Sequence, residues 1–168
     1  MNPSVKSKGF YKLHQITEVL NNFKQKNIPV SFVAIVETWL KDYITDAQLN
    51  ICHYNVYRSD RSKSKNGGAL LYIHESIIID IFDSFDDDTC NAVICLSSKS
   101  NAIICCIYRP PSAGQNSFIN MLNFISRFID THNKSDKLKT FLFGDFNFPD
   151  IHWKNDQITE YIRSPLCH

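Results

Sequence analysis

The sequence predicts a layered α/β fold in which helices cover mixed β-sheets. Two amphipathic segments, residues 10–23 and 118–129, carry apolar side chains at near-helical spacing. Short apolar runs typical of buried strands lie between and after these segments, for example at 31–36 and 102–108. The chain has 168 residues, of which 43% are hydrophobic and 21% charged, so we expect one globular domain over residues 1–168.

The elements are expected in the order helix, strand, hairpins, helix, strand. The first helix should end between Asn27 and Pro29, because proline cannot continue a helix. Polar residues at 97–100 should join their neighbours as a hairpin, and residues 59–68, rich in Lys, Ser and Gly, should form a loop. The pattern fades beyond Pro149, so residues 154–168 are predicted to be an irregular tail. Strands are expected at 31–36, 54–57, 69–73, 77–81, 90–96, 102–108 and 140–143.

Charge and cysteine usage limit the possible partners and compartments. The formal net charge is +1, so a nucleic-acid partner would have to meet a local basic patch rather than a global field. No apolar stretch is long enough to cross a bilayer, so no membrane partner is expected, and the first residues lack the apolar core of a secretory signal. The six cysteines show no C-x-x-C spacing, which favours free thiols in a reducing, nuclear or cytoplasmic compartment over a zinc site.

The run 141–149 places a carboxylate and an amide after an apolar strand. Asp145 and Asn147 stand two residues apart behind Gly144, and alternation along an extended backbone would put both side chains on one side. A carboxylate can hold a hard divalent cation, and an amide can bond a phosphate oxygen or orient a water. By itself, Gly-Asp-x-Asn is more often a plain turn.

Two further strand ends carry residues suited to phosphate chemistry. Glu37 follows the apolar run 31–36, and together with Asp145 it would supply the two acids that a magnesium site needs. Tyr108 and Arg109 precede two prolines, and a phenol and a guanidinium can both donate to a phosphate. Taken singly, these motifs also fit a solvated strand end and a half-buried tyrosine beside a surface arginine.

One stretch of the chain concentrates basic residues ahead of Gly67 and Gly68. Its members are Arg58, Arg61, Lys63 and Lys65. They could contact a nucleic-acid backbone, with the glycines permitting close approach. They could equally form a solvated hairpin loop in which Asp60 pairs with an arginine. The residues leave both interpretations open.

The order of these motifs resembles the endonuclease/exonuclease/phosphatase superfamily, and in particular the endonuclease domain of non-LTR retrotransposon polyproteins. The resemblance runs from about Tyr11 to Trp153. It implies a two-sheet α/β sandwich with flanking helices, the DNase I-like fold. It also implies Mg²⁺- or Mn²⁺-dependent hydrolysis of a DNA phosphodiester, which nicks target DNA to prime reverse transcription. The matching motifs are Glu37-Thr-Trp-Leu, Arg58-x-Asp-Arg with Gly67-Gly68, Tyr108-Arg-Pro-Pro and Gly144-Asp-Phe-Asn-Phe-Pro.

The resemblance also implies roles for single residues. Glu37 would be a metal ligand, and Tyr108 would bond the scissile phosphate. Asp145 would orient or deprotonate the attacking water, with Asn147 supporting it. DNA is the implied partner, together with the rest of a polyprotein. The residues assigned to nucleic-acid contact are Arg58, Arg61, Lys63, Lys65 and Arg109.

The chain departs from the family at both ends. Aligning Ser4 with the family pattern puts Met1, not Asn2, where the family has a metal-placing asparagine. The chain reaches His168 without the family's Ser-Asp-His motif and last strands. We therefore expect a sandwich incomplete at the C-terminus, with unpaired sheet edges and with weak or absent activity in this fragment. A non-catalytic nucleic-acid-binding remnant is the alternative, and a phosphatase acting on a small phosphoester is a third hypothesis.

Overall fold

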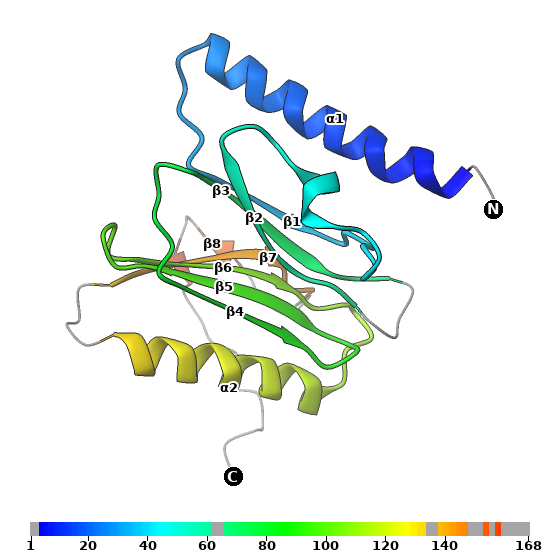
Figure 1. The fold of residues 1–168 in the computed structure, drawn as a ribbon. Helices are drawn as coiled ribbons and strands as arrows, with labels where there is room; N and C mark the ends of the chain where they lie inside the picture. The colour runs from blue at the N-terminus through cyan, green and yellow to red at the C-terminus, as the bar shows by residue number, and fades with distance from the viewer. Residues whose placement is uncertain (1–3, 62–65, 134–137, 148–152, 155–156, 159–168) are drawn as a thin grey trace.

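Two β-sheets pack face to face, and a helix covers the outer face of each (Figure 1). The computed structural model of the chain describes residues 4–61, 66–133, 138–147, 153–154 and 157–158. Its layers run from helix α1 through a three-stranded sheet and a four-stranded sheet to helix α2. The predicted α/β sandwich with flanking helices is confirmed.

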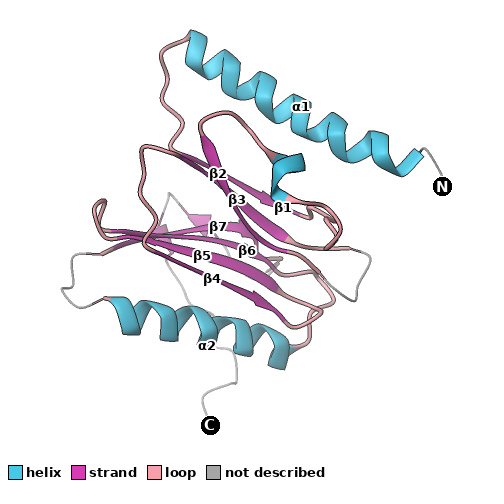
Figure 2. Cartoon of the chain, in the orientation of Figure 1, coloured by secondary structure: helices cyan, strands magenta, loops and turns pink. Residues whose placement is uncertain are grey.

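Helices and strands follow one another along the chain in nearly the order that the sequence predicts (Figure 2). Sheet A has the order β1-β3-β2 and is antiparallel throughout. Sheet B has the order β4-β5-β6-β7, in which only β6 and β7 run parallel, joined through α2. The described elements are α1 Ser4–Gln25, β1 Phe32–Val36, the 3₁₀ helix η1 Asp46–Leu49, β2 Tyr54–Ser59, β3 Ala69–His74, β4 Ile81–Asp86, β5 Asn91–Ser97, β6 Ala102–Tyr108, α2 Gln115–His132, β7 Lys139–Asp145, β8 Trp153–Lys154 and β9 Gln157–Ile158.

The central strands β5 and β6 are buried over their whole length because both of their faces are covered. Val93 and Cys95 of β5 pack against sheet A, while the alternate residues Ala92 and Ile94 pack against α2. The hairpin predicted around residues 97–100 is confirmed by this antiparallel pair. Side chains on α1, including Leu20, close the outer face of sheet A.

Strands β1 and β7 form neighbouring edges of the two sheets and are more exposed than the sequence suggests. In the described part of the chain each pairs with only one strand. The rings of Phe32 on β1 and Phe143 on β7 meet at 4.9 Å between centroids, while Phe141 and Leu142 are 39% and 48% exposed. An apolar run fits a central strand and an edge strand equally well, so the sequence could not separate the two cases.

One predicted strand is wrong. Residues 77–80 form no strand, and the N–H of Ile77 turns back to the carbonyl oxygen of His74 at 2.9 Å. The strand at this place is β4, which begins at Ile81 and pairs antiparallel with β5. It mixes polar and apolar residues without regular alternation on a mostly exposed edge, so it lacks the continuous apolar run used to identify buried strands. The predicted tail at 154–168 lies largely outside the described residues.

Gly144 is required by the close approach of β7 to β6. Its φ is +143°, and a Cβ at this position would collide with the backbone carbonyl of Ile107. We expect Gly144→Ala to lower the free energy of unfolding by about 2 kcal/mol, measured by urea denaturation. Gly114→Ala is the matched control, because a Cβ there meets nothing within 4 Å, and as a change at the N-cap of α2 it should cost less than about 1 kcal/mol. Equal effects of the two substitutions would contradict this account of Gly144.

Candidate active site

The carboxyl ends of β1, β6 and β7 meet at one end of the sandwich. Because β6 and β7 run parallel, Tyr108 and Asp145 occupy the same register position at the ends of their strands. Glu37 follows β1 directly. The Tyr108 hydroxyl donates a hydrogen bond of 2.9 Å to the Oε1 carboxylate oxygen of Glu37. The structure thus brings together three side chains that lie up to 108 positions apart in the sequence.

The backbone at this end is held in an unusual conformation. Glu37 and Trp39 have φ values of 54° and 53°, in the left-handed region that L-residues with long side chains rarely adopt. The other described non-glycine residues with positive φ are Asn, Asp or His, which tolerate it better. The Trp39 N–H donates to the Gly67 carbonyl at 2.9 Å, which ties the exit of β1 to the glycine pair. Strain of this kind is characteristic of functional sites.

Gly68 lets the glycine pair approach the exit of β1 closely. Its φ is +94°, and a Cβ there would collide with the Thr38 hydroxyl. That hydroxyl is buried, and within the described residues it has no hydrogen-bond partner. Thr38 thus leaves a buried hydroxyl next to Glu37 that is covered by Gly68 and unpaired in the described part of the chain.

The pKa of the Tyr108 phenol is raised to about 12, mainly by burial. The hydrogen bond to Glu37, the negative charge of that carboxylate and the charge of Asp145 contribute to this rise, while the charge of Arg61 opposes it. The phenol therefore stays protonated through the neutral range and can donate a hydrogen bond.

The raised pKa of Tyr108 links protein stability to alkaline pH. The unfolded chain ionises this phenol near pH 10, whereas the folded chain holds its proton to about pH 12. Its contribution to stability is complete below pH 10 and is lost as pH rises toward 12. We expect the difference in unfolding free energy between wild type and Tyr108→Phe to be constant from pH 7 to 9 and to change between pH 10 and 12, as measured by urea denaturation. A constant difference over the whole range would contradict the assignment.

Asn147 lies beyond the extended part of β7, which ends at Asp145. Its φ is 47°, so the alternation from which its direction was predicted does not extend to it. Instead, the Asn147 side chain donates to the Arg109 carbonyl at 2.7 Å, and the Arg109 guanidinium donates to the Asn147 carbonyl at 2.7 Å. The Arg109 N–H also donates to the Asp145 carbonyl at 2.9 Å. These bonds fix the exits of β6 and β7 against each other.

Asn91 is a buried residue of this end that the sequence analysis missed. It is fully buried, and its Oδ1 accepts the Gly68 N–H at 3.1 Å. Its Nδ2 donates to Ser59 Oγ at 3.3 Å and to Asp86 Oδ1 at 3.2 Å. The Ser59 hydroxyl in turn donates to the Phe85 carbonyl at 2.7 Å. Asn91 therefore fastens sheet A to sheet B directly behind the glycine pair.

The arginines of the basic stretch are engaged within the fold. The Arg58 Nε lies 3.1 Å from Asp46 Oδ1 and 3.3 Å from Asp60 Oδ2, so the local Asp–Arg pairing considered for this loop is present. Arg61 is 7% exposed, and its guanidinium donates to the carbonyls of Asn66 and Thr89.

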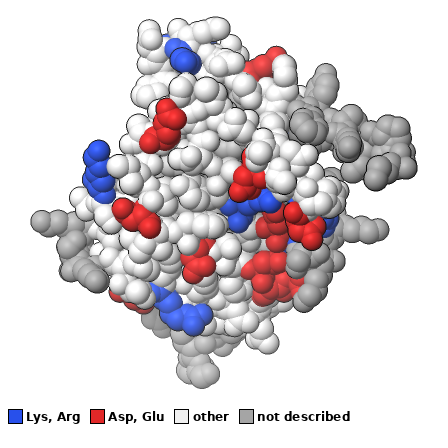
Figure 3. All heavy atoms as spheres, in the orientation of Figure 1, with Lys and Arg blue, Asp and Glu red and all other residues white. Residues whose placement is uncertain are grey.

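The same guanidinium of Arg61 lies 5.9 Å from the Tyr108 ring centroid, and that of Arg109 lies 5.3 Å from the Phe118 ring centroid. Lys63 and Lys65 lie outside the described residues. On the face drawn in Figure 3, basic and acidic side chains are interspersed rather than separated. Nucleic-acid contact by the basic residues remains a prediction.

The donor set at this end fits magnesium rather than zinc. Among the described residues no group of three His, Cys, Asp or Glu side chains is placed to hold a metal ion. Magnesium needs only one or two carboxylates, completed by water and phosphate oxygens, and Glu37 with Asp145 can meet that need. The five described cysteines are free thiols. Asn2 and His168 lie outside the described residues.

Helices long and apolar enough to span a membrane are absent from the described part of the chain. No protein-family model matches the chain, and no curated protein matches its sequence.

Solved structures share the fold at low sequence identity. An AP endonuclease from Archaeoglobus fulgidus has a TM-score of 0.50 and 16% identity, over 84% of this chain and 56% of that one. TDP2 from Caenorhabditis elegans has a TM-score of 0.49 and 14% identity, over 82% of this chain and 44% of that one. A truncated C. elegans TDP2 has the same score and identity, with 57% of that chain covered. The chain thus spans about half the length of these proteins, and it has the two-sheet α/β sandwich of DNase I-like proteins, the fold of the Archaeoglobus enzyme.

Proposed function

We propose that the chain is a metal-dependent DNA endonuclease domain that hydrolyses phosphodiesters at the end of the sandwich formed by Glu37, Tyr108 and Asp145. The observation that carries the proposal is the hydrogen bond of 2.9 Å between Tyr108 and Glu37, with Asp145 beside Tyr108 in the sheet register. A carboxylate pair can hold a metal ion and activate water, and a protonated phenol can donate to the phosphate, so the three groups together suit phosphodiester hydrolysis.

Each residue has a part that follows from its chemistry. Glu37 would hold Mg²⁺ or Mn²⁺, which when bound offsets the charge that develops on the phosphoryl oxygens. The Tyr108 hydroxyl has a single proton, so on substrate binding it would turn from Glu37 and donate to a non-bridging oxygen of the phosphate, which leaves the Glu37 carboxylate to the metal. Asp145 would orient the attacking water and accept its proton. Asn147, bonded to the Arg109 carbonyl, would hold the exits of β6 and β7 in place.

The order of the sequence motifs supports a finer proposal, that the domain derives from the endonuclease of a non-LTR retrotransposon and nicks target DNA to prime reverse transcription. The shared fold with an AP endonuclease is compatible with action on DNA but does not specify it.

Nicking of supercoiled plasmid tests the proposed activity. We expect open circles to form slowly with Mg²⁺ or Mn²⁺, in keeping with the weak activity expected of this fragment, and none to form in EDTA. DNA binding without nicking at any concentration of either metal, by protein whose circular dichroism shows it folded, would reject the endonuclease and leave the nucleic-acid-binding remnant.

A further inference from the structure

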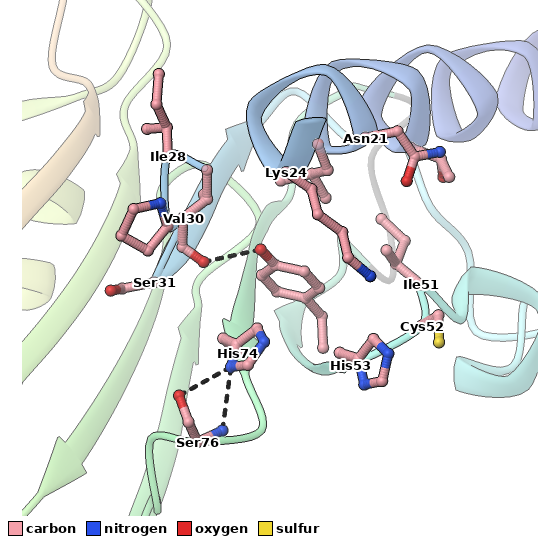
Figure 4. A pocket seen from close by; sticks show the side chains of 14 residues that line it. Asn21, Lys24, Ile28, Val30, Ser31, Ile51, Cys52, His53, His74 and Ser76 are labelled. Atoms are coloured by element: carbon pink, nitrogen blue, oxygen red, sulfur yellow. Dashed lines mark hydrogen bonds between the residues drawn. The ribbon is translucent and has the colours of Figure 1, made fainter. Parts of the chain in front are cut away.

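A cavity of about 460 Å³ lies at the opposite end of sheet A from Glu37. It is bounded by the C-terminal half of α1, by Ser31 before β1 and by the adjoining ends of β2 and β3 (Figure 4). Ser31 and Glu37 are six positions apart along an extended segment, a span of roughly 20 Å at the rise of a β-strand. The cavity is therefore separate from the candidate active site, and the inference below does not depend on the proposed endonuclease activity.

The floor of the cavity is apolar. Leu20 and Ile51 are buried there, and Val30 and the Tyr54 ring complete the surface. The Tyr54 hydroxyl is already committed, since it donates to the Val30 carbonyl at 2.8 Å. A floor of this kind favours an apolar or aromatic group over water.

The hydrogen bonds of His74 determine which of its ring nitrogens carries the proton in the neutral form. Its Nδ1 accepts the backbone N–H of Ser76 at 3.2 Å, and a backbone N–H can only donate. In the neutral imidazole the proton is therefore on Nε2, which lies on the side of the ring away from Ser76 (Figure 4). The hydrogen bonds of His74 to Ser76 use only Nδ1, and the Tyr54 ring packs against the His74 ring at 5.2 Å between centroids, so Nε2 is the ring nitrogen left to bond a ligand.

Lys24 brings a positive charge to the same cavity. Its side chain reaches from the last turn of α1 toward Cys52 and His53 (Figure 4). The described residues hold no ion-pair partner for it. The carboxylate of Glu75, the residue after His74, pairs with His53, whose Nδ1 lies 2.8 Å from Glu75 Oε1. The charge of Lys24 is thus left without a counter-ion above the apolar floor.

We propose that this cavity binds a small molecule with one anionic group, a phosphate or a carboxylate, on a compact aromatic or apolar body. The anion would lie between the Lys24 ammonium and the Nε2–H of His74, which are both hydrogen-bond donors. The body would lie on Leu20, Ile51 and the Tyr54 ring. Charge and shape together would select such a molecule over a free inorganic anion or a neutral aromatic compound.

Titration of the full chain with four probes tests the proposal. In EDTA, which excludes metal-assisted binding near Glu37, ¹H–¹⁵N spectra are recorded with phenyl phosphate, benzoate, benzyl alcohol and inorganic phosphate. We expect phenyl phosphate or benzoate to bind at least about tenfold more tightly than the last two, and comparing these two anions identifies the preferred group. The shifts should centre on Lys24, Ile51 and His74. Equal binding of benzyl alcohol, no binding of either anion, or shifts centred on Glu37 and Tyr108 would overturn the proposal.

Two substitutions distinguish binding in this cavity from general electrostatic attraction of the anion to the protein surface. Lys24→Gln and His74→Phe should each weaken binding of the preferred probe by about fivefold or more, because each removes a donor to the anion. Lys26→Gln is the matched control, since it removes an exposed charge from the same end of α1 but does not line the cavity, and it should leave binding unchanged. Equal affinities of the Lys24 and Lys26 variants would also overturn the proposal.

Discussion

Replacing Glu37 with Gln, or Asp145 with Asn, is expected to lower the rate of Mg²⁺-dependent plasmid nicking about a thousandfold or more. Each change keeps the shape of the side chain and removes one of the two carboxylates at this end of the sandwich. Glu37→Gln weakens metal binding, and Asp145→Asn removes the acceptor for the proton of the attacking water. Nicking rates measured over a Mg²⁺ titration separate the two effects, because weaker metal binding raises the Mg²⁺ concentration needed, whereas loss of the proton acceptor lowers the rate at saturating Mg²⁺.

Two matched substitutions separate these effects from loss of charge alone. Glu18→Gln on α1 and Asp130→Asn on α2 alter exposed acids outside the candidate site and should leave the nicking rate within about twofold of wild type. A Glu37→Gln variant that nicks as fast as Glu18→Gln would show that the carboxylate of Glu37 has no part in catalysis.

Asn91→Ala is expected to lower the free energy of unfolding by about 3 kcal/mol. The substitution removes three hydrogen bonds of a fully buried side chain and leaves the Gly68 N–H and the Ser59 hydroxyl with one partner fewer. Because Gly68 packs against Thr38, the exit of β1 should lose order as well. Urea denaturation measures the first effect, and the amide shifts of residues 37–39 measure the second.

A conservative change and a surface change test this role of Asn91. Asn91→Asp keeps the acceptor for Gly68 but loses both donors and places a second carboxylate beside Asp86, so it should be at least as destabilising as Asn91→Ala at pH 7. Asn123→Ala, on the exposed side of α2, should change stability by less than about 0.5 kcal/mol. Asn91→Ala with no greater effect than Asn123→Ala would contradict the proposed link between the sheets.

The layered fold could be predicted because the spacing of apolar residues along the sequence reflects which side chains are buried. Strands β5 and β6 are covered on both faces and therefore appear as unbroken apolar runs, and the two helices show their apolar stripes. The edge strands could not be predicted in the same way. Strand β4 carries polar residues because it is exposed, while β7 is apolar although it is an edge.

Site residues at the ends of strands could be predicted from the sequence. Residues whose role comes from packing between the two sheets could not. Glu37, Tyr108 and Asp145 each follow or end an apolar run, and sheet register brings such positions together. Asn91 was missed because its partner Ser59 is 32 positions away and lies on the other sheet. The direction of the Asn147 side chain could not be predicted from alternation, because the chain leaves the extended conformation after β7.

Paramagnetic broadening by Mn²⁺ tests most directly whether Glu37 and Asp145 form one metal site. The account predicts that substoichiometric Mn²⁺ broadens the ¹H–¹⁵N signals of Glu37, Tyr108 and Asp145 together, while the β5–β6 turn at 98–101, at the other end of these strands, keeps sharp signals. The broadening should disappear in the Glu37→Gln, Asp145→Asn double variant. Uniform broadening, or broadening that survives in the double variant, would mean that these acids, although neighbours in the fold, do not hold an ion between them.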